Sequence, residues 1–450
     1  MRGFVHQFHR HQINRRGKAG KMPDRERLSR QRLSRRAKLA GGQPISELMS
    51  MALARPELIS LAAGFVDTET LPVEAVREAM EALLADPGEA KAALQYGSTP
   101  GDPALREALL ERLRADDGDP ACEADLSIDQ VLIGAGSNQL LHLVIETLLD
   151  PQDIILCAAP SYFVFLGMLA NLDLRSVGIA TDEDGMIPEA LEEELVRREA
   201  AGDLPRVKAI YVCSYFDNPS STTLCAQRRA SIIEIAQRWS KKTKIHIIED
   251  AAYRQLRYSG PAVPSMLAYD EAGDTVILAD TFSKSFSPGV RVGWIVLPRH
   301  LIGPVADQKG NIDFGSPNLN QHLMAKVLRR GLYEPQIERF RENYRRKRDA
   351  MLEAADEHLA RVEGAHWHRP DGGLYVWLRL PETIDAGPGG PLVEAALDEG
   401  VLYVPGEYCY PSEGAPREKN TMRLSFGVQS CENIRRGIEA LARAIATINP

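Results

Sequence analysis

The sequence lacks several features that define specialised classes of protein. No apolar run reaches the 18 residues that a membrane-spanning helix needs, and the N-terminus has no apolar segment of a secretory signal. The cysteines lie far apart, with no C-x-x-C pair and no histidine at metal-ligand spacing; they are Cys122, Cys157, Cys213, Cys225, Cys409 and Cys431. We therefore expect a soluble, cytoplasmic protein with buried thiols in a reducing compartment, no metal site and no membrane association.

The glycine motifs of nucleotide-binding proteins are also missing. The phosphate-loop pattern G-x-x-x-x-G-K-[ST] does not occur. Residues 134–139 (GAGSNQ) depart from the dinucleotide pattern G-x-G-x-x-G, because Gln139 stands where the third glycine is required. A hydride-transfer or nucleotide-dependent reaction therefore loses its main support.

The composition itself is that of an ordinary globular protein. Of the 450 residues, 44% are hydrophobic and 26% are charged, which is enough apolar material for a large core. This length allows two or three domains. Fibrous, collagenous and disulfide-scaffold classes are excluded.

The net charge of −8 is an average over two unlike regions. Residues 1–40 carry a net charge of +11, whereas the remaining residues carry −19, which argues against a nucleic-acid-binding body. We expect residues 1–40 to be a disordered basic extension, or codons translated upstream of a start at Met22. A transit peptide and a nucleic-acid-binding arm are open alternatives, although serine is scarce and no aromatic platform is interleaved with the charges.

Beyond residue 40, short apolar runs alternate with longer helical stretches, which is typical of an α/β fold. Near-continuous apolar runs favour buried strands of a mostly parallel sheet; they span residues 130–133, 153–157, 207–213, 244–248, 275–278 and 291–296. From about residue 325 the pattern changes to a long charged helix over 332–357, strands at 374–380 and 421–426, and a final helix over 432–448. This change predicts a second, smaller α+β domain.

Polar side chains follow four of the predicted strands. Lys284 lies in a Ser/Gly/Pro-rich loop with Arg291 seven residues later, Asp250 and Tyr253 follow another strand, and Asn218 follows a third. Residues 134–139 end a fourth strand and open a helix, an arrangement that offers backbone N–H groups to an anion. Each signal has an ordinary alternative: a surface lysine, a helix-capping aspartate or a plain turn.

Together, these four strand ends suit one cofactor. Ligands of open α/β sheets bind outside the carboxyl ends of the strands. Pyridoxal 5′-phosphate needs a lysine for its Schiff base, a carboxylate to keep its pyridine nitrogen protonated and a cradle for its phosphate. The sequence therefore predicts a pyridoxal-phosphate site, with Lys284 and Asp250 as its central residues.

The chain resembles the class I/II aminotransferases of the fold type I, pyridoxal-phosphate-dependent family from about residue 45 to its C-terminus. It is most similar to the branch with 2-aminoadipate, kynurenine and aromatic amino-acid aminotransferases and the effector domains of MocR-type regulators. Besides the strand ends, the matching segments are LAAGFVDTETLP (61–72), LQYGSTPGDPALREAL (94–109), APSYF (159–163), PDGGLYVWLRLP (370–381) and NTMRLSFG (420–427).

The resemblance implies the fold and the domain division. It implies a large domain with a mostly parallel seven-stranded sheet between helices, and a smaller α+β domain. Residues 91–324 would form the large cofactor-binding domain, and residues 41–90 with 325–450 the small domain. It also implies a homodimer, in which Tyr96 reaches the cofactor phosphate of the neighbouring subunit.

The resemblance also implies a role for each site residue. The implied catalytic residues are Lys284, Asp250 and Tyr253. The implied cofactor-binding residues are Gly136, Ser137, Asn138, Tyr162, Asn218, Asp250, Tyr253, Ser283, Lys284, Arg291 and Tyr96. Gly64, Asn218 and Arg423 would bind the substrate, with Arg423 on its α-carboxylate, where a planar guanidinium matches the carboxylate geometry.

Two features depart from the family pattern. The usual Asn-Pro-Thr-Gly is here Asn218-Pro219-Ser220-Ser221, so that a turn glycine is replaced by Ser221 and we expect an altered loop beside an intact Asn218. The basic extension before residue 40 has no counterpart. Residues 34–50 could contribute to specificity, because the family's N-terminal helix often closes the substrate pocket.

The implied activity is an aminotransferase reaction with a ping-pong mechanism. An L-amino acid of aromatic, 2-aminoadipate or branched-chain type would donate its amino group to a 2-oxo acid such as 2-oxoglutarate. A β-lyase, an oxidase, a racemase and a non-catalytic ligand sensor are alternatives, because one site of this kind supports several outcomes. The first 40 residues contain no helix-turn-helix pattern, which disfavours the sensor, and no nucleic-acid partner is expected.

Overall fold

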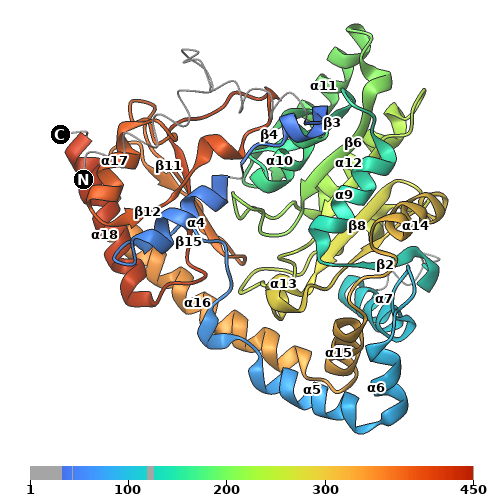
Figure 1. Ribbon diagram of the computed structural model, residues 1–450. Coiled ribbons are helices and arrows are strands. Elements are labelled where there is room, and N and C mark those ends of the chain that lie inside the picture. The colour runs from blue at the N-terminus through green and yellow to red at the C-terminus, as the bar shows by residue number, and fades with distance from the viewer. Residues whose placement is uncertain (1–32, 43, 119–125, 449–450) are drawn as a thin grey trace.

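The computed structural model describes residues 33–42, 44–118 and 126–448. Its strands form a large nine-stranded sheet, a four-stranded sheet and a two-stranded pair. In Figure 1, the large sheet and its helices lie on the right, and the small sheet lies on the left with α18. The chain is therefore organised around two separate sheets.

Seven longer strands carry the large sheet. Their order across the sheet is β4 (Arg175–Asp182), β3 (Ile154–Ala159), β6 (Val207–Cys213), β7 (His246–Asp250), β8 (Val276–Thr281), β9 (Gly293–Val296) and β2 (Val131–Gly134). The first five are mutually parallel, and β9 is antiparallel to both of its neighbours. Two short strands, β5 (Gly185–Met186) and β14 (Glu413–Gly414), pair with β4. The predicted α/β class with a mostly parallel seven-stranded sheet is confirmed, and the two short strands raise the count to nine.

Helices cover both faces of this sheet because its strands are apolar on both sides. Along β3, Ile154 and Leu156 belong to one buried cluster, while Ile155 and Cys157 belong to the cluster on the opposite face. On the second face lie α9 (Ser137–Leu148), α10 (Phe163–Asn171) and α14 (Arg299–Asp313). The first face is covered by α7 (Pro103–Asp117), α11 (Pro188–Ala200), α12 (Ala226–Trp239) and α15 (Asn318–Arg329). Strands buried on both faces are typical of parallel sheets between helices.

The small sheet is antiparallel, and its order is β10 (His366–Trp367), β11 (Tyr375–Arg379), β15 (Thr421–Ser425) and β13 (Val404–Pro405). Two long helices, α16 (Tyr333–His358) and α18 (Cys431–Ile448), pack against each other beside it. Nearby, β1 (Ile59–Ser60) pairs with β12 (Val401–Leu402). The predicted helices at 332–357 and 432–448 and strands at 374–380 and 421–426 are confirmed to within about two residues.

Six further α-helices lie within the described residues. They are α3 (Arg35–Leu39), α4 (Pro44–Ala54), α5 (Val73–Ala85), α6 (Pro87–Leu94), α13 (Phe282–Ser285) and α17 (Pro391–Asp398). The described part of the basic extension includes α3, where Ser34 accepts a hydrogen bond from the backbone of Ala37 as a helix cap. Ion pairs join Arg35 to Asp173 and Arg36 to Glu146. This short end of the predicted extension is therefore folded, and residues 1–32 lie outside the described part of the chain.

The predicted domain division stays a proposal. In agreement with it, the small sheet draws its strands from residues after 365. Several contacts cross the proposed boundaries; for example, α5 packs against α15, and β14 pairs with the large sheet through β4.

None of the described helices is both long and apolar enough to cross a membrane. The described cysteines are all free thiols, and Cys157, Cys213 and Cys409 are buried. Cys122 lies outside the described residues.

Candidate active site

The carboxyl ends of four strands of the large sheet supply the predicted site residues. Gly136 follows β2, Asn218 follows β6, Asp250 is the last residue of β7, and Lys284 lies in α13 directly after β8. Because β6, β7 and β8 are adjacent and parallel, their ends meet at one edge of the sheet. Polar side chains that are distant in sequence are thereby collected in one place.

One end of this site is built to hold an anion. Helix α9 begins after Gly136 with no side-chain cap on its first turn, so its N-terminus and dipole are free for a ligand. Gly136 has a φ of +90°, and a β-carbon there would lie 2.6 Å from a guanidinium nitrogen of Arg291. Arg291 also donates to the hydroxyl of Ser283 at 3.4 Å. A cationic side chain, a hydroxyl and a helix N-terminus therefore converge, which suits a phosphate.

Asp250 is a buried carboxylate with neutral partners. It accepts hydrogen bonds from the hydroxyl of Tyr211 at 2.9 Å and from the backbone of Ala252 at 3.2 Å. Burial raises the pKa of Asp250, and the two hydrogen bonds oppose that rise. No cationic side chain pairs with Asp250 within the described ranges, so a positively charged ligand atom would stabilise its ionised form.

The amine of Lys284 contacts the backbone of Gly64 and lies near the ring of Tyr253. It donates to the carbonyl oxygen of Gly64 at 2.7 Å and lies 5.9 Å from the ring centre of Tyr253. Burial lowers the pKa of Lys284 to about 8, and the positive charges of Arg423 and Arg291 act in the same direction. A substantial fraction of this amine is therefore neutral near pH 8, as a nucleophile or base requires.

Arg423 is a fully buried guanidinium on β15 of the small sheet. It donates to the side-chain oxygen of Asn218 at 2.8 Å and to the carbonyl of Ala62 at 2.7 Å. The guanidinium carbon Cζ of Arg423 lies 4.3 Å from the ring centre of Tyr375 and 5.2 Å from that of Phe163. The buried Nε has no hydrogen-bond partner. An arginine held this way is ready to bind a planar anion such as a carboxylate.

Ser221, which departs from the family pattern, has a left-handed backbone conformation. Its φ is +59°, in the left-handed region that favours glycine. Its hydroxyl donates to the carbonyl of Tyr375 at 2.7 Å, and the hydroxyl of Tyr375 hydrogen-bonds that of Tyr253 at 2.9 Å. The hydroxyl of Ser221 thus links the loop after β6 to the small sheet, and the expectation of an altered loop stays a prediction.

The structure brings twelve of the thirteen predicted site residues together through contacts or close charges. Tyr162 lies near the side chains of Asn138, Asp250 and Arg423. The twelve are Gly64, Gly136, Ser137, Asn138, Tyr162, Asn218, Asp250, Tyr253, Ser283, Lys284, Arg291 and Arg423. Tyr96 is the exception, because it is 83% exposed and its only described ring contact is with Phe314.

Sequence reasoning missed Tyr211 and Tyr375. Tyr211 lies within the predicted buried strand at 207–213, and Tyr375 lies in the segment 370–381, which resembles the family but has no residue with an implied role. The signal for Tyr211 is its place two residues before the end of β6, next to the strand that ends at Asp250.

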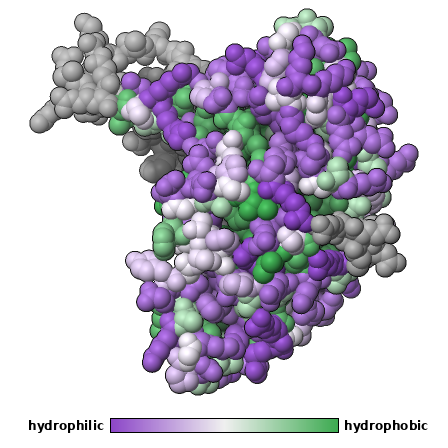
Figure 2. Space-filling model, turned by 90° about the vertical axis from the view of Figure 1, so that its right-hand side faces the viewer, coloured by the Kyte–Doolittle hydropathy of each residue, from purple (hydrophilic) through white to green (hydrophobic). Residues whose placement is uncertain are grey.

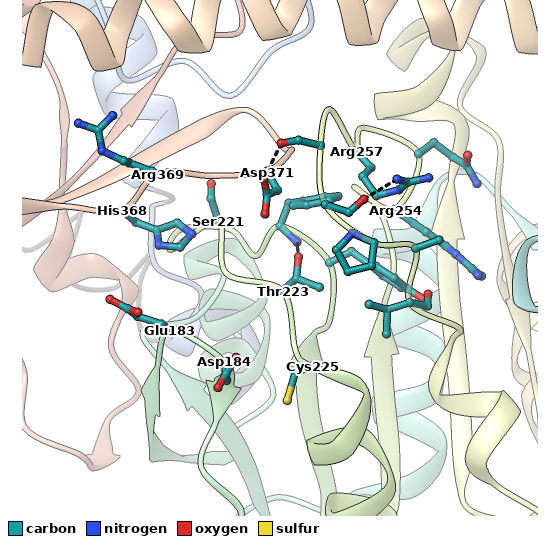
Figure 3. Close-up of a pocket in the computed structure, with 18 of the residues that line it drawn as sticks. Glu183, Asp184, Ser221, Thr223, Cys225, Arg254, Arg257, His368, Arg369 and Asp371 are labelled. Carbon is teal, nitrogen blue, oxygen red and sulfur yellow. Dashed lines mark hydrogen bonds between the residues drawn. The ribbon is translucent and has the colours of Figure 1, made fainter.

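A separate cavity of about 320 Å³ lies beside the site, between the loops that follow β6 and β7 and the turn before β11. In the view of Figure 3, Ser221 lies between His368 and Asp371, and Thr223 lies lower. Arg254 and Arg257 also line it, and Arg257 donates to the carbonyl of Gly260. Lys284, Asp250 and Arg423 are absent from its lining, so this cavity is distinct from the candidate active site.

A lysine of lowered pKa, a buried carboxylate and an anion cradle at the strand ends of an α/β sheet define a pyridoxal-phosphate enzyme. The comparisons agree. Residues 56–441 match the family model described as aminotransferase class I and II. The protein belongs to this family, and it is an aminotransferase with pyridoxal 5′-phosphate as its cofactor.

Named relatives lie in one branch of the family. The chain is 36% identical to aromatic-amino-acid aminotransferase 1 of Thermococcus litoralis, over 89% of this chain and 91% of that protein. The kynurenine aminotransferase of Pyrococcus horikoshii, solved with PMP, superimposes with a TM-score of 0.85 at 33% identity, covering 94% and 98% of the two chains. For LysN, the alpha-aminoadipate aminotransferase of Thermus thermophilus, the TM-score is 0.80 at 30% identity, with 94% and 99% covered.

The residues present fit pyridoxal phosphate on three structural grounds. Asp250 is a buried carboxylate that lacks a cationic partner among the described side chains, and a protonated pyridine nitrogen would supply one. The uncapped start of α9, with Gly136 and Arg291, offers a place for the phosphate. Lys284 presents an amine of lowered pKa in the same site, near Arg291 and Arg423.

Proposed function

We propose that the protein transfers the amino group of an L-amino acid to a 2-oxo acid such as 2-oxoglutarate by a ping-pong mechanism. The observation that carries this proposal is the pairing of Lys284, an amine of lowered pKa, with the buried guanidinium of Arg423 in one site. A base and a carboxylate-binding group are what an amino-acid substrate needs at its Cα atom.

Each site residue has a distinct task in this proposal. Asp250 holds the positive charge of the cofactor ring, Asn218 and Tyr253 bind its ring hydroxyl, and Ser283 and Arg291 bind its phosphate. When bound, pyridoxal phosphate supplies a ring that accepts the electron pair left when Cα loses its proton. Lys284 holds the cofactor and, once released as a free amine, moves the proton.

Arg423 orients the substrate by binding its α-carboxylate. A bidentate contact between a guanidinium and a carboxylate restricts both position and rotation. With the carboxylate held, the Cα–H bond is directed toward the base Lys284, which favours loss of the proton over loss of carbon dioxide. This orientation is the reason that we assign transamination.

The proposed donor is an amino acid of aromatic, 2-aminoadipate or branched-chain type. An apolar cluster lies beside the guanidinium of Arg423, where Phe163 contacts it. Its buried members include Leu48, Ala62, Phe163, Trp377, Val404 and Tyr410. A side chain with apolar bulk fits such surroundings, and the named relatives include an aromatic-amino-acid and a kynurenine aminotransferase.

We also propose a homodimer in the cytoplasm. Exposed apolar side chains occur where α6 and α14 end: Leu94, Tyr96, Ile312 and Phe314. Tyr96 and Phe314 are in edge-to-face contact, with ring centres 5.9 Å apart. Figure 2 shows hydrophobic surface near the middle of one face, framed by hydrophilic residues. Large apolar side chains that are exposed close together favour a protein partner. The free thiols support the second part of the proposal, because they suit a reducing compartment such as the cytoplasm.

A spectroscopic amino-acid screen tests the proposed function. The purified protein is loaded with pyridoxal phosphate, single amino acids are added, and conversion of the cofactor to its amino form is followed by absorption. We expect conversion by donors of the proposed types and reversal by 2-oxoglutarate. Release of ammonia, consumption of oxygen, or binding without conversion would each replace transamination by a lyase, an oxidase or a sensor.

A further inference from the structure

Tyr375 belongs to the small sheet, but its atoms contact the active site at three points. It is the first residue of β11 and is 1% exposed. Its hydroxyl, its ring and its backbone carbonyl each contact a different group. These three contacts join residues that the proposed function uses separately.

The hydroxyl of Tyr375 faces the catalytic side of the site. It lies 2.9 Å from the hydroxyl of Tyr253. It also lies close to Gly64, where a β-carbon would approach it to 2.6 Å, so only glycine leaves room for it. The carbonyl of Gly64 in turn accepts the hydrogen bond from Lys284. Tyr375 thus packs against two groups that border the catalytic amine.

The ring of Tyr375 lies against the guanidinium of Arg423. The separation of 4.3 Å between the guanidinium carbon and the ring centre is a cation–π contact, which is strongest when desolvated, as it is here. On β11 and β15, Tyr375 is paired with Ser425 and Trp377 with Arg423. The ring therefore restrains the group that is proposed to bind the substrate carboxylate.

The carbonyl of Tyr375 is held from the large sheet by Ser221. The serine hydroxyl is buried and donates at 2.7 Å. The left-handed backbone conformation is unfavourable for a non-glycine residue, and the buried hydrogen bond offsets part of that cost. Ser221 also borders the 320 Å³ cavity (Figure 3). Its hydrogen bond holds the backbone of Tyr375 directly to the loop after β6 of the large sheet.

We propose that Tyr375 is a positioning residue of the active site, anchored by Ser221: its hydroxyl directs the proton of Tyr253, and its ring orients Arg423. This inference rests on the proposed function and extends it. A hydroxyl has one proton to donate. When Tyr375 donates to Tyr253, the proton of Tyr253 is free to point to the cofactor ring oxygen. Without the hydroxyl of Tyr375, nothing directs the proton of Tyr253 toward that oxygen.

The first test is Tyr375→Phe, with Tyr258→Phe as a matched control. Tyr258 is also buried, and its hydroxyl donates to the carbonyl of Gly373 in the turn before β11, without contact with Tyr253 or Arg423. The readout is the pH midpoint of the visible absorption of the bound cofactor. Weaker donation by Tyr253 leaves more negative charge on the ring oxygen, which retains the titrating proton more strongly. We expect Tyr375→Phe to raise this midpoint by about 0.5 to 1 pH unit and the control to leave it unchanged.

The second test is Ser221→Ala, with Ser259→Ala as its control. The hydroxyl of Ser259 donates to Asp371 on the small-sheet side and lines the same cavity, but it does not touch Tyr375. The probe is 3-phenylpropanoate, which carries a carboxylate and no amino group; its binding to the cofactor-free protein is measured by calorimetry. We expect Ser221→Ala to raise the dissociation constant about 3- to 10-fold, and KM more than it lowers kcat. Ser259→Ala should change neither value.

These outcomes separate the two proposals. If the unmodified protein takes up no pyridoxal phosphate, the proposed function itself fails. If it binds the cofactor and titrates, but Tyr375→Phe and Ser221→Ala behave as their controls do, only the role of Tyr375 is overturned. Retained thermal unfolding temperatures of all four variants establish that the comparison concerns folded protein.

Discussion

The guanidinium of Arg423 donates to the side-chain oxygen of Asn218 at 2.8 Å, and this bond links the small sheet to the loop after β6 of the large sheet. Asn218 is proposed to bind the cofactor, and Arg423 the substrate. The two binding sites are therefore in direct contact, and a substrate carboxylate arrives at a group that the cofactor site already orients.

Arg423→Lys should weaken substrate binding more than turnover. Lysine keeps the charge but loses the planar, bidentate contact with a carboxylate, and a single ammonium nitrogen replaces the two nitrogens that bond Asn218 and Ala62. We expect KM for the amino acid to rise about 10- to 100-fold, from the loss of a charged hydrogen bond. Steady-state kinetics measures this, and an unchanged KM would remove Arg423 from the substrate site. Arg435→Lys, on the exposed side of α18, is the control.

Lys284→Ala should abolish covalent attachment of the cofactor. Reduction with borohydride fixes a lysine-bound pyridoxal phosphate, and peptide mass spectrometry then locates it. We expect the modified peptide to contain Lys284 in the unmodified protein and no modified peptide in the variant. Lys241→Ala, whose amine contacts only the ring of Trp239 among the described residues, should leave attachment intact. Attachment at any other lysine would contradict the assignment.

The lowered pKa of Lys284 should appear as a pH-dependent stability of the cofactor-free protein. Folding lowers the pKa of this amine from its ordinary 10.5 to about 8. Between these values the unfolded chain binds more protons, so stability rises with pH across this window. Below pH 8 the buried charge of Lys284 lowers the free energy of unfolding by roughly 3 kcal/mol at most. Lys284→Met should thus stabilise the cofactor-free protein at pH 7, and the difference should vanish above pH 10.5. Urea unfolding of the variant and of the unmodified protein at both pH values measures the difference in stability. A difference that does not depend on pH would show that the charge of Lys284 is not its cause.

Much of this fold follows from the sequence, because the strands of a parallel sheet are buried on both faces and appear as apolar runs. Strand β4 (Arg175–Asp182) was missed, since it begins and ends with charged residues and its second half is partly exposed. The site residues at the strand ends could be predicted as well, because the apolar runs show where each strand ends. Tyr211 and Tyr375 could not, because their roles depend on which strands become neighbours. Tyr375 contacts Tyr253 across 122 positions of the chain, and no local pattern encodes that contact.

Asp250→Asn should keep the cofactor but lose most of the activity. The amide has nearly the same shape and can still bond Tyr211, so binding through the phosphate end persists. It cannot hold a proton on the cofactor ring as a carboxylate does, so we expect the rate of the half-reaction to fall about 100-fold or more. Rapid-mixing absorption measurements give this rate. An undiminished rate would show that the charge of Asp250 has no part in the reaction.

Tyr96 should serve the active site of the neighbouring subunit, and mixed dimers test this directly. Alone, Tyr96→Ala weakens phosphate binding and Lys284→Ala is inactive. In a dimer with one subunit of each kind, the subunit with the intact lysine receives Tyr96 from its partner. That site is then complete, whereas the other site carries both defects. After subunit exchange of equal amounts we expect roughly a quarter of the original activity, because half of the dimers are mixed and each has one complete site. If Tyr96 acted within its own subunit, mixing would restore nothing, and a fully active monomer in sedimentation experiments would exclude the shared site altogether.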